Sequence, residues 1–381
     1  MAAAIARGVY RLREDSITTV ADRGQRLGCE GMFTTTDRSR FEGKSGGLAW
    51  KKISGFGYMA VGQGEFSGDL LLVTRGTAIS VDWLSNLNIG MQLGPSDLPV
   101  HAGFNEVWKS FAPEVREFLR GRNPSRIHCV GHSLGGALAA LNADLLTSGK
   151  VADVALYTFG SPRVGDGVFA RSLTRGVGPD NIYRVSHPAD PVPMIPLFPF
   201  WHLPFNRGGL SIANTQNSLI SVGAHSMEPS YIPGVAGQTW GSLARSALSA
   251  NESAQVTGWL EQAAQGGSPM LMGSAQLLSM IGRVLKWLLA KAGMLVMGAV
   301  GVTLTVGATL LDQLAWLLSR GVSASKELAG YVTTLIGAIF RFLGRTVSAA
   351  TDITMAFLRW VLDLLFSSLS SVATQALALV R

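Results

Sequence analysis

The stretch SRIHCVGHSLGGALAAL, residues 125–141, holds the strongest structural signal in the chain. Its beginning, 125–130, in which Ile127, Cys129 and Val130 are apolar, predicts a buried strand, and the helix formers from Ala137 to Leu141 predict a helix. The turn between them has the pattern G-x-S-x-G, in which glycines permit a backbone too crowded for larger side chains. A strand, a tight turn and a helix in this order predict that Ser133 is a nucleophile presented at a sharp bend.

The start of the predicted helix also indicates how a negative charge beside Ser133 would be stabilised. Leu134 follows the serine directly, so its backbone N–H lies at the positive end of the helix dipole. A donor in this place can hold the oxyanion that forms when a hydroxyl attacks a carbonyl group. We therefore expect Leu134 to supply one oxyanion contact.

From about residue 50 to residue 235, short runs rich in Val, Ile and Leu alternate with helical patterns. This alternation is typical of an α/β fold with a central, mostly parallel sheet. Four strands are predicted, at 69–74, 125–130, 154–159 and 181–185. In such sheets ligands bind at the carboxyl ends of the strands, so the residues that follow each strand are the candidates for function.

A serine hydroxyl needs a histidine to accept its proton and a carboxylate to orient that histidine. On an α/β sheet with this turn, the acid and then the histidine follow the serine in the chain, which leaves His202 and His225. His225 lies on a small-residue loop after a strand-like run, 219–222, and is favoured. His202 stands in the aromatic-rich run 198–203, which suits a pocket wall, and stays as the alternative.

The acid is predicted to be Asp190, just beyond the strand that ends at residue 185. Pro191 fixes the backbone after it and so holds the carboxylate in one direction. An Asp-Pro pair more often serves only to cap a turn, and Asp166 is the alternative acid. A second oxyanion donor is sought in an earlier loop, where Thr77 of the run TRGT, 74–77, offers an N–H and a hydroxyl.

Five ordered blocks between residues 50 and 235 resemble the class 3 lipase family, which includes fungal triacylglycerol lipases and bacterial phospholipases A1. The blocks are TRGT at 74–77, VHAGF at 100–104, GHSLGG at 131–136, TFGSPRVG at 158–165 and DPVP at 190–193. The resemblance implies an α/β-hydrolase fold, hydrolysis of lipid esters, and no metal or organic cofactor. It also implies Thr77 as an oxyanion residue and a lid at 82–93 with Trp83 at its tip. We expect His132 and Trp201 at the substrate pocket.

Composition changes after the catalytic part and predicts two units, 1–265 and 270–381. Ala292–Leu311 contains twenty uncharged residues, just enough to span a bilayer. The segments 328–340 and 353–369 are shorter or interrupted by charges and are expected to be amphipathic. We expect the tail to associate with a membrane; a soluble helical bundle and a pore that makes the protein a permeabilising toxin are the alternatives.

The net charge of +7 fits an anionic membrane surface better than a nucleic acid, because Lys and Arg do not form runs with interleaved aromatic residues. Membrane lipid is therefore the expected partner. The first residues lack the pattern of a secretory signal, so we expect a membrane-associated protein on the cytoplasmic side or one exported by a non-standard route. An inhibitory or chaperone protein stays open as a partner, and the oligomeric state is not predicted.

Overall fold

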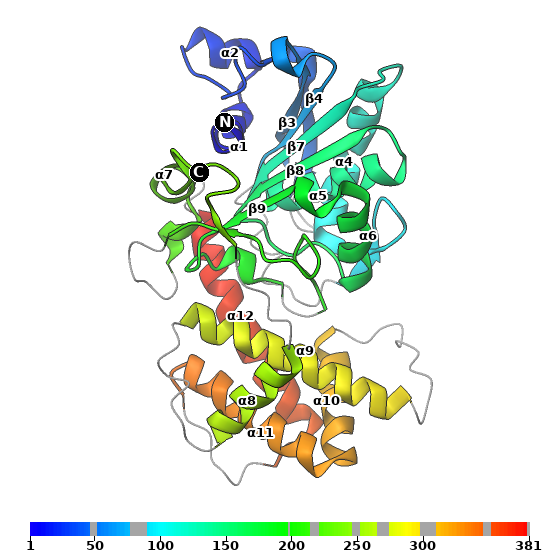
Figure 1. The fold of residues 1–381 in the computed structure, drawn as a ribbon, viewed down its shortest axis with the longest axis vertical. Helices are drawn as coiled ribbons and strands as arrows, with labels where there is room; N and C mark the ends of the chain where they lie inside the picture. The colour runs from blue at the N-terminus through cyan, green and yellow to red at the C-terminus, as the bar shows by residue number, and fades with distance from the viewer. Residues whose placement is uncertain are drawn as a thin grey trace.

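The computed structural model describes residues 1–45, 52–76, 90–196, 199–213, 221–245, 252–264, 274–297, 310–345 and 352–378. A twisted sheet with helices on both faces forms the first part of the chain, and a group of helices forms the second (Figure 1). The alternation of strands and helices predicted an α/β fold with a central, mostly parallel sheet, followed by a helical region, and the structure confirms this architecture.

The central sheet has the strand order β1-β3-β4-β7-β8-β9-β10-β11, with β2 paired to β3. Neighbouring strands are parallel from β4 to β10 and antiparallel at both flanks. The four predicted strands appear as β4, β7, β8 and β9. The strands are β1 (Phe33–Thr34), β2 (Arg40–Ser45), β3 (Lys52–Gly62), β4 (Leu70–Thr74), β7 (Arg126–His132), β8 (Asp153–Phe159), β9 (Ile182–Ser186), β10 (Leu210–Ser211) and β11 (Ala244–Arg245).

Helices cover the two faces of the sheet because the strands in its centre are apolar on both sides. α4 (Ala102–Leu119), α5 (Leu134–Ser148) and α6 (Gly167–Val177) pack on one face. The N-terminal α1 (Ala2–Gly8) lies on the other, where α2 (Ile17–Asp22) and α7 (Ile232–Val235) join the same apolar cluster. A separate hairpin, β5 (Met91–Leu93) with β6 (Pro99–His101), precedes α4.

The helical region consists, among the described residues, of α8 (Glu252–Ala264), α9 (Ser274–Met297), α10 (Leu310–Ala324), α11 (Lys326–Phe342) and α12 (Met355–Ala378). These helices pack on one another, and their apolar residues continue into the cluster beneath α4, α5 and α6. The boundary predicted between 265 and 270 lies outside the described residues, as does most of the predicted span Ala292–Leu311. The first six residues of that span end α9, and its last two begin α10.

One helix in the described part of the chain, α12, is long and apolar enough to cross a membrane, over the window Met355–Ala376. The sequence pattern suggests Ala292–Leu311 instead. About two fifths of this window, 39%, is buried inside the structure. A core helix of a soluble protein can have the same length and composition, so the finding by itself assigns no membrane span.

Candidate active site

Ser133 occupies the sharp turn between β7 and α5 with a φ of +61°, a conformation that non-glycine residues rarely adopt. Two glycines leave the space that the backbone of this turn needs. A Cβ on Gly131 would lie 2.1 Å from the carbonyl oxygen of Gly135, and a Cβ on Gly135 would lie 2.3 Å from the carbonyl oxygen of Thr74. Leu134 is the first residue of α5, so its N–H has no partner within the helix.

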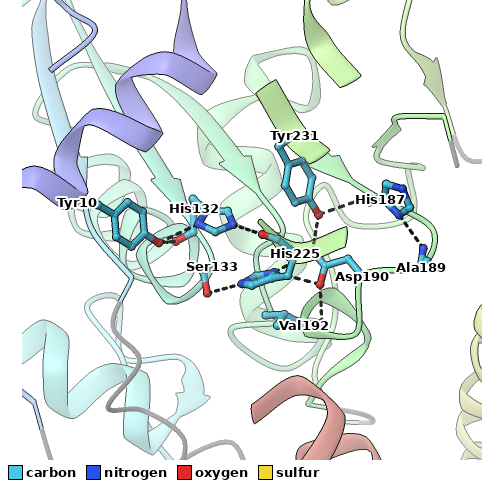
Figure 2. A network of polar contacts seen from close by, with 9 residues as sticks. All are labelled: Tyr10, His132, Ser133, His187, Ala189, Asp190, Val192, His225 and Tyr231. Carbon is cyan, nitrogen blue, oxygen red and sulfur yellow. Dashed lines mark hydrogen bonds and ion pairs between the residues drawn. The ribbon is translucent and has the colours of Figure 1, made fainter. Parts of the chain in front are cut away.

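His225 stands beside the serine, at the end of the short helix η7 (Val222–His225). Its Nε2 lies 2.8 Å from Ser133 Oγ, and its Nδ1 lies 2.9 Å from Asp190 Oδ2 (Figure 2). Neither Ser133 nor His225 has exposed surface. Because Nδ1 donates its proton to the carboxylate, Nε2 is left free to accept the serine proton, which is the arrangement that general-base activation of a hydroxyl needs.

Asp190 is held from further directions by backbone and side-chain donors. Its Oδ1 accepts the backbone N–H of Val192 at 2.9 Å, and its Oδ2 accepts the Tyr231 hydroxyl at 2.6 Å. Tyr231 also accepts the N–H of His187, and burial together with the nearby carboxylate raises the pKa of Tyr231 well above its usual value. These contacts fix the carboxylate where it meets the imidazole. Gly160, with φ +55°, leaves the room for them.

Behind Ser133 and His225, His132 connects the N-terminal segment to the candidate site (Figure 2). Its Nε2 lies 2.8 Å from the carbonyl oxygen of His225, and its Nδ1 lies 2.8 Å from the Tyr10 hydroxyl. Burial, and the proximity of His225, lower the pKa of His132 well below its usual value, so the ring is neutral, donating through Nε2 and accepting through Nδ1. The ring is fully buried in this network, whereas the sequence predicts that it lies at the substrate pocket.

The alternatives that the sequence left open take other places. Asp166 is the N-cap of α6 and accepts the backbone N–H groups of Val168 and Phe169. His202 lies near Arg163 and Arg184, and burial lowers its pKa well below the usual value. Ser133 is therefore brought together with Asp190 and His225, and the alternative acid and base have other surroundings.

The remaining candidates are only partly placed. Thr77 and Trp83 lie outside the described residues, as does the predicted lid apart from 90–93, of which 91–93 form β5. Trp201 forms an isolated bridge with Gly165 and packs against Phe205, at a ring-centroid distance of 5.2 Å. Val222, the end of the strand-like run 219–222, begins η7 instead of ending a strand, and the earlier residues of that run are, apart from Ser221, outside the described part.

Three contributors to the site were not identified from the sequence. Tyr10 comes from η1 (Val9–Leu12), more than a hundred residues before His132, and a contact so distant leaves no local pattern. Tyr231 follows His225 by six residues in the π-helical turn η8 (Met227–Tyr231). Gly160 belongs to the TFGSPRVG block. Its place directly after the predicted strand 154–159 was the one feature of the sequence that could have marked it as part of the site.

Comparison with known proteins gives a consistent result for the centre of the catalytic part. Residues 71–200 match the family model described as lipase (class 3). The secreted mono- and diacylglycerol lipase 1 of Fusarium solani is 36% identical over 135 residues, covering 34% of this chain and 39% of the relative. Phospholipase A1-II 1 of Oryza sativa subsp. indica is 32% identical over 183 residues, covering 39% of this chain and 46% of the relative.

The chain thus spans less than half the length of these two curated relatives. Among solved structures, lipase II from Rhizopus niveus matches with 23% identity and a TM-score of 0.38, over 55% of this chain and 77% of that one. Residues 71–200, which include the turn at Ser133, thus resemble the class 3 lipase family.

Proposed function

We propose that this protein is a lipolytic carboxylic-ester hydrolase, a lipase or a phospholipase A1, with Ser133 as its nucleophile. The observation that carries the proposal is the unbroken chain of hydrogen bonds from Ser133 Oγ through both nitrogens of His225 to Asp190. The family of residues 71–200 and the relatives that match it support the same class of reaction.

In the proposed first step, Ser133 Oγ attacks the acyl carbonyl of the ester while His225 Nε2 accepts the hydroxyl proton. Asp190 keeps the proton of Nδ1 in place and stabilises the imidazolium that forms. His225 then gives its proton to the departing alcohol, and the acyl group stays on the serine. Water, activated by the same imidazole, releases the fatty acid and restores the free hydroxyl.

The negative oxygen of each tetrahedral intermediate is assigned to the N–H of Leu134 and to Thr77. One such donor is typically worth about 2.7–4 kcal/mol of activation free energy. Arg75 fixes the backbone two residues before Thr77. Its guanidinium donates hydrogen bonds to the carbonyl oxygens of Gly55 and Gly76 and to Ser54 Oγ. These contacts hold the loop at its last described residues.

The substrate proposed is a lipid in a membrane. Of the two relatives, one is by name a mono- and diacylglycerol lipase and the other a phospholipase A1. A helical tail with an excess of basic residues suits a phospholipid surface, so we propose that phospholipid is cleaved at least as well as triglyceride.

Ser133→Ala tests the proposal, with Ser148→Ala, an exposed position at the end of the same α5, as the matched control. Both variants and the unchanged chain are incubated with mixed phospholipids and triglyceride, and the freed acyl chains are identified by mass spectrometry. We expect fatty acid from the unchanged chain and from Ser148→Ala, and none from Ser133→Ala. Undiminished release by Ser133→Ala would refute the site.

A further inference from the structure

The last helix of the chain reaches the edge of the sheet where the candidate active site lies. α12 packs against η7, which ends in His225, and against η6 (Val192–Met194), which follows Asp190. Figure 1 shows the C-terminal end of α12, in red, beside the end of β9, and in Figure 2 the same helix passes close to Val192. The helical region therefore touches both turns that hold the base and the acid.

α12 has one buried face and one exposed face. Its buried residues recur every three or four positions, while Asp363 and Gln375 are exposed. Arg359 is also exposed but forms an ion pair with Asp312 of α10. The buried side chains are large in the first half of the helix and small in the second, and they are Leu358, Val361, Leu362, Leu365, Phe366, Leu369, Ser370, Ala373 and Ala376. Small side chains bury little apolar area, so the half of α12 nearer to the active site is held more weakly than the other.

The other end of α12 is suited to a lipid surface. Trp360 is 46% exposed and Met355 40% exposed, although both are large and apolar. Trp360 packs with Phe357 and Phe340, at ring-centroid distances of 5.7 and 5.8 Å. Aromatic side chains of this kind favour the interface between headgroups and acyl chains. After residue 270 the sequence has nine Lys or Arg and four Asp or Glu, which favours anionic lipid.

The burial of Ser133 and His225 suggests how α12 could control access to them. Ser133 and His225 are fully buried, so an ester in a membrane can reach the hydroxyl only after a covering element moves. We propose that α12 is a clasp: it holds η7 and η6 in the closed site, and an anionic phospholipid bilayer withdraws it by taking up its apolar face. The proposal rests on the function proposed for Ser133, whose access it regulates.

Hydrogen–deuterium exchange on the full chain tests the release directly. The vesicles are made of ether-linked phosphatidylglycerol, which has no carboxylic ester and so is not consumed, and ether-linked phosphatidylcholine vesicles serve as the neutral control. We expect amide exchange in 222–225 and in the second half of α12 to rise about tenfold or more when the anionic vesicles bind. Unchanged protection of these segments in the vesicle-bound protein, or no binding to the vesicles, overturns the proposal.

A matched pair of variants tests whether release opens the site. Ala376→Glu places a charge on the buried face near the end of α12, and Gln375→Glu places the same charge on the exposed face. The readout is hydrolysis of a soluble short-chain ester without lipid. We expect Ala376→Glu to raise this rate about tenfold, which corresponds to about 1.4 kcal/mol, and to lose stimulation by vesicles, whereas Gln375→Glu behaves like the unchanged chain.

An Ala376→Glu protein that keeps the circular dichroism spectrum of the unchanged chain, yet hydrolyses the soluble ester no faster, contradicts the clasp. If that variant does not fold, the exchange experiment on the unchanged chain decides alone. The two proposals fail separately. If vesicles raise amide exchange in η7 and α12 but the chain has no esterase activity, the proposed function is wrong. If the chain is active but amide exchange in α12 stays slow on vesicles, the clasp is wrong.

Discussion

A single methyl group added at Gly160 should disconnect the acid from the base. The backbone of Gly160 has a φ of +55°, and a Cβ built on it would lie 2.7 Å from Asp190 Oδ2 and 3.1 Å from His225 Nδ1. Ordinary contacts of a Cβ begin at 3.4 Å. In Gly160→Ala the carboxylate oxygen must therefore retreat by about 0.7 Å, and the imidazole must shift by a few tenths of an ångström.

The size of the effect follows from how steeply catalysis depends on position. A misplacement of about 1 Å costs about 100-fold in rate, so we expect kcat of Gly160→Ala to fall about 30- to 100-fold, or about 2–2.7 kcal/mol of activation free energy. KM for a soluble ester should stay within about threefold. The added methyl group displaces Asp190 and His225 but removes no contact that binds the substrate in its ground state.

The positive φ also strains any alanine, and this contribution needs its own control. Gly121 has a φ of +71°, and no atom lies within 4 Å of the position that a Cβ would take there, so Gly121→Ala introduces the strain without the collision. We expect Gly121→Ala to lose about 1–2 kcal/mol of unfolding free energy and Gly160→Ala at least as much, measured by urea denaturation, but only Gly160→Ala to lose activity. A folded Gly160→Ala protein that keeps more than about a third of the original kcat refutes the reasoning.

Two further predictions concern buried polar groups. Tyr231→Phe removes a hydrogen bond to the carboxylate of Asp190, so we expect the unfolding free energy to fall by about 1.5–3 kcal/mol and kcat about tenfold; unchanged values for both would contradict the role given to this hydroxyl. Burial raises the pKa of Asp144 from 3.8 to about 6, so the folded chain binds this proton more tightly than the unfolded chain. The unfolding free energy should therefore fall by about 2–3 kcal/mol as the pH rises from about 4 to about 6. Urea denaturation at about pH 4 and about pH 7 should show that Asp144→Asn abolishes this loss and that the exposed Asp153→Asn does not. If the unfolding free energies of both variants depend equally on pH, Asp144 is not the group responsible.

Sequence patterns predicted the catalytic part where local rules decide the structure. Short runs rich in apolar residues located β4, β7, β8 and β9, because a central parallel strand is covered on both faces and is therefore mostly apolar. The turn at Ser133 was predictable because only glycines tolerate its close approaches. Asp190 and His225 were selected by chain order and by their place after predicted strands, and the structure brings His225 to Ser133 and Asp190 to His225.

Other parts of the site depend on contacts that leave no local pattern. Tyr10 and Tyr231 reach His132 and Asp190 through the tertiary fold alone, and each sits in a segment whose sequence suggests nothing of the role. The packing of α12 against η7 joins the end of the chain to a loop more than a hundred residues earlier. Periodicity predicted that the end of the chain is helical, but it does not say what a helix packs against.

The central claim is that Ser133 is made reactive by His225 and Asp190, and covalent trapping tests it most directly. The full chain is treated with a fluorophosphonate ester, digested, and analysed by mass spectrometry for the modified residue. We predict a single phosphonylated site at Ser133, formed at least about 1,000-fold more slowly in His225→Ala. A label on another residue while ester hydrolysis is lost, or labelling of Ser133 at the same rate without the imidazole, would contradict the account.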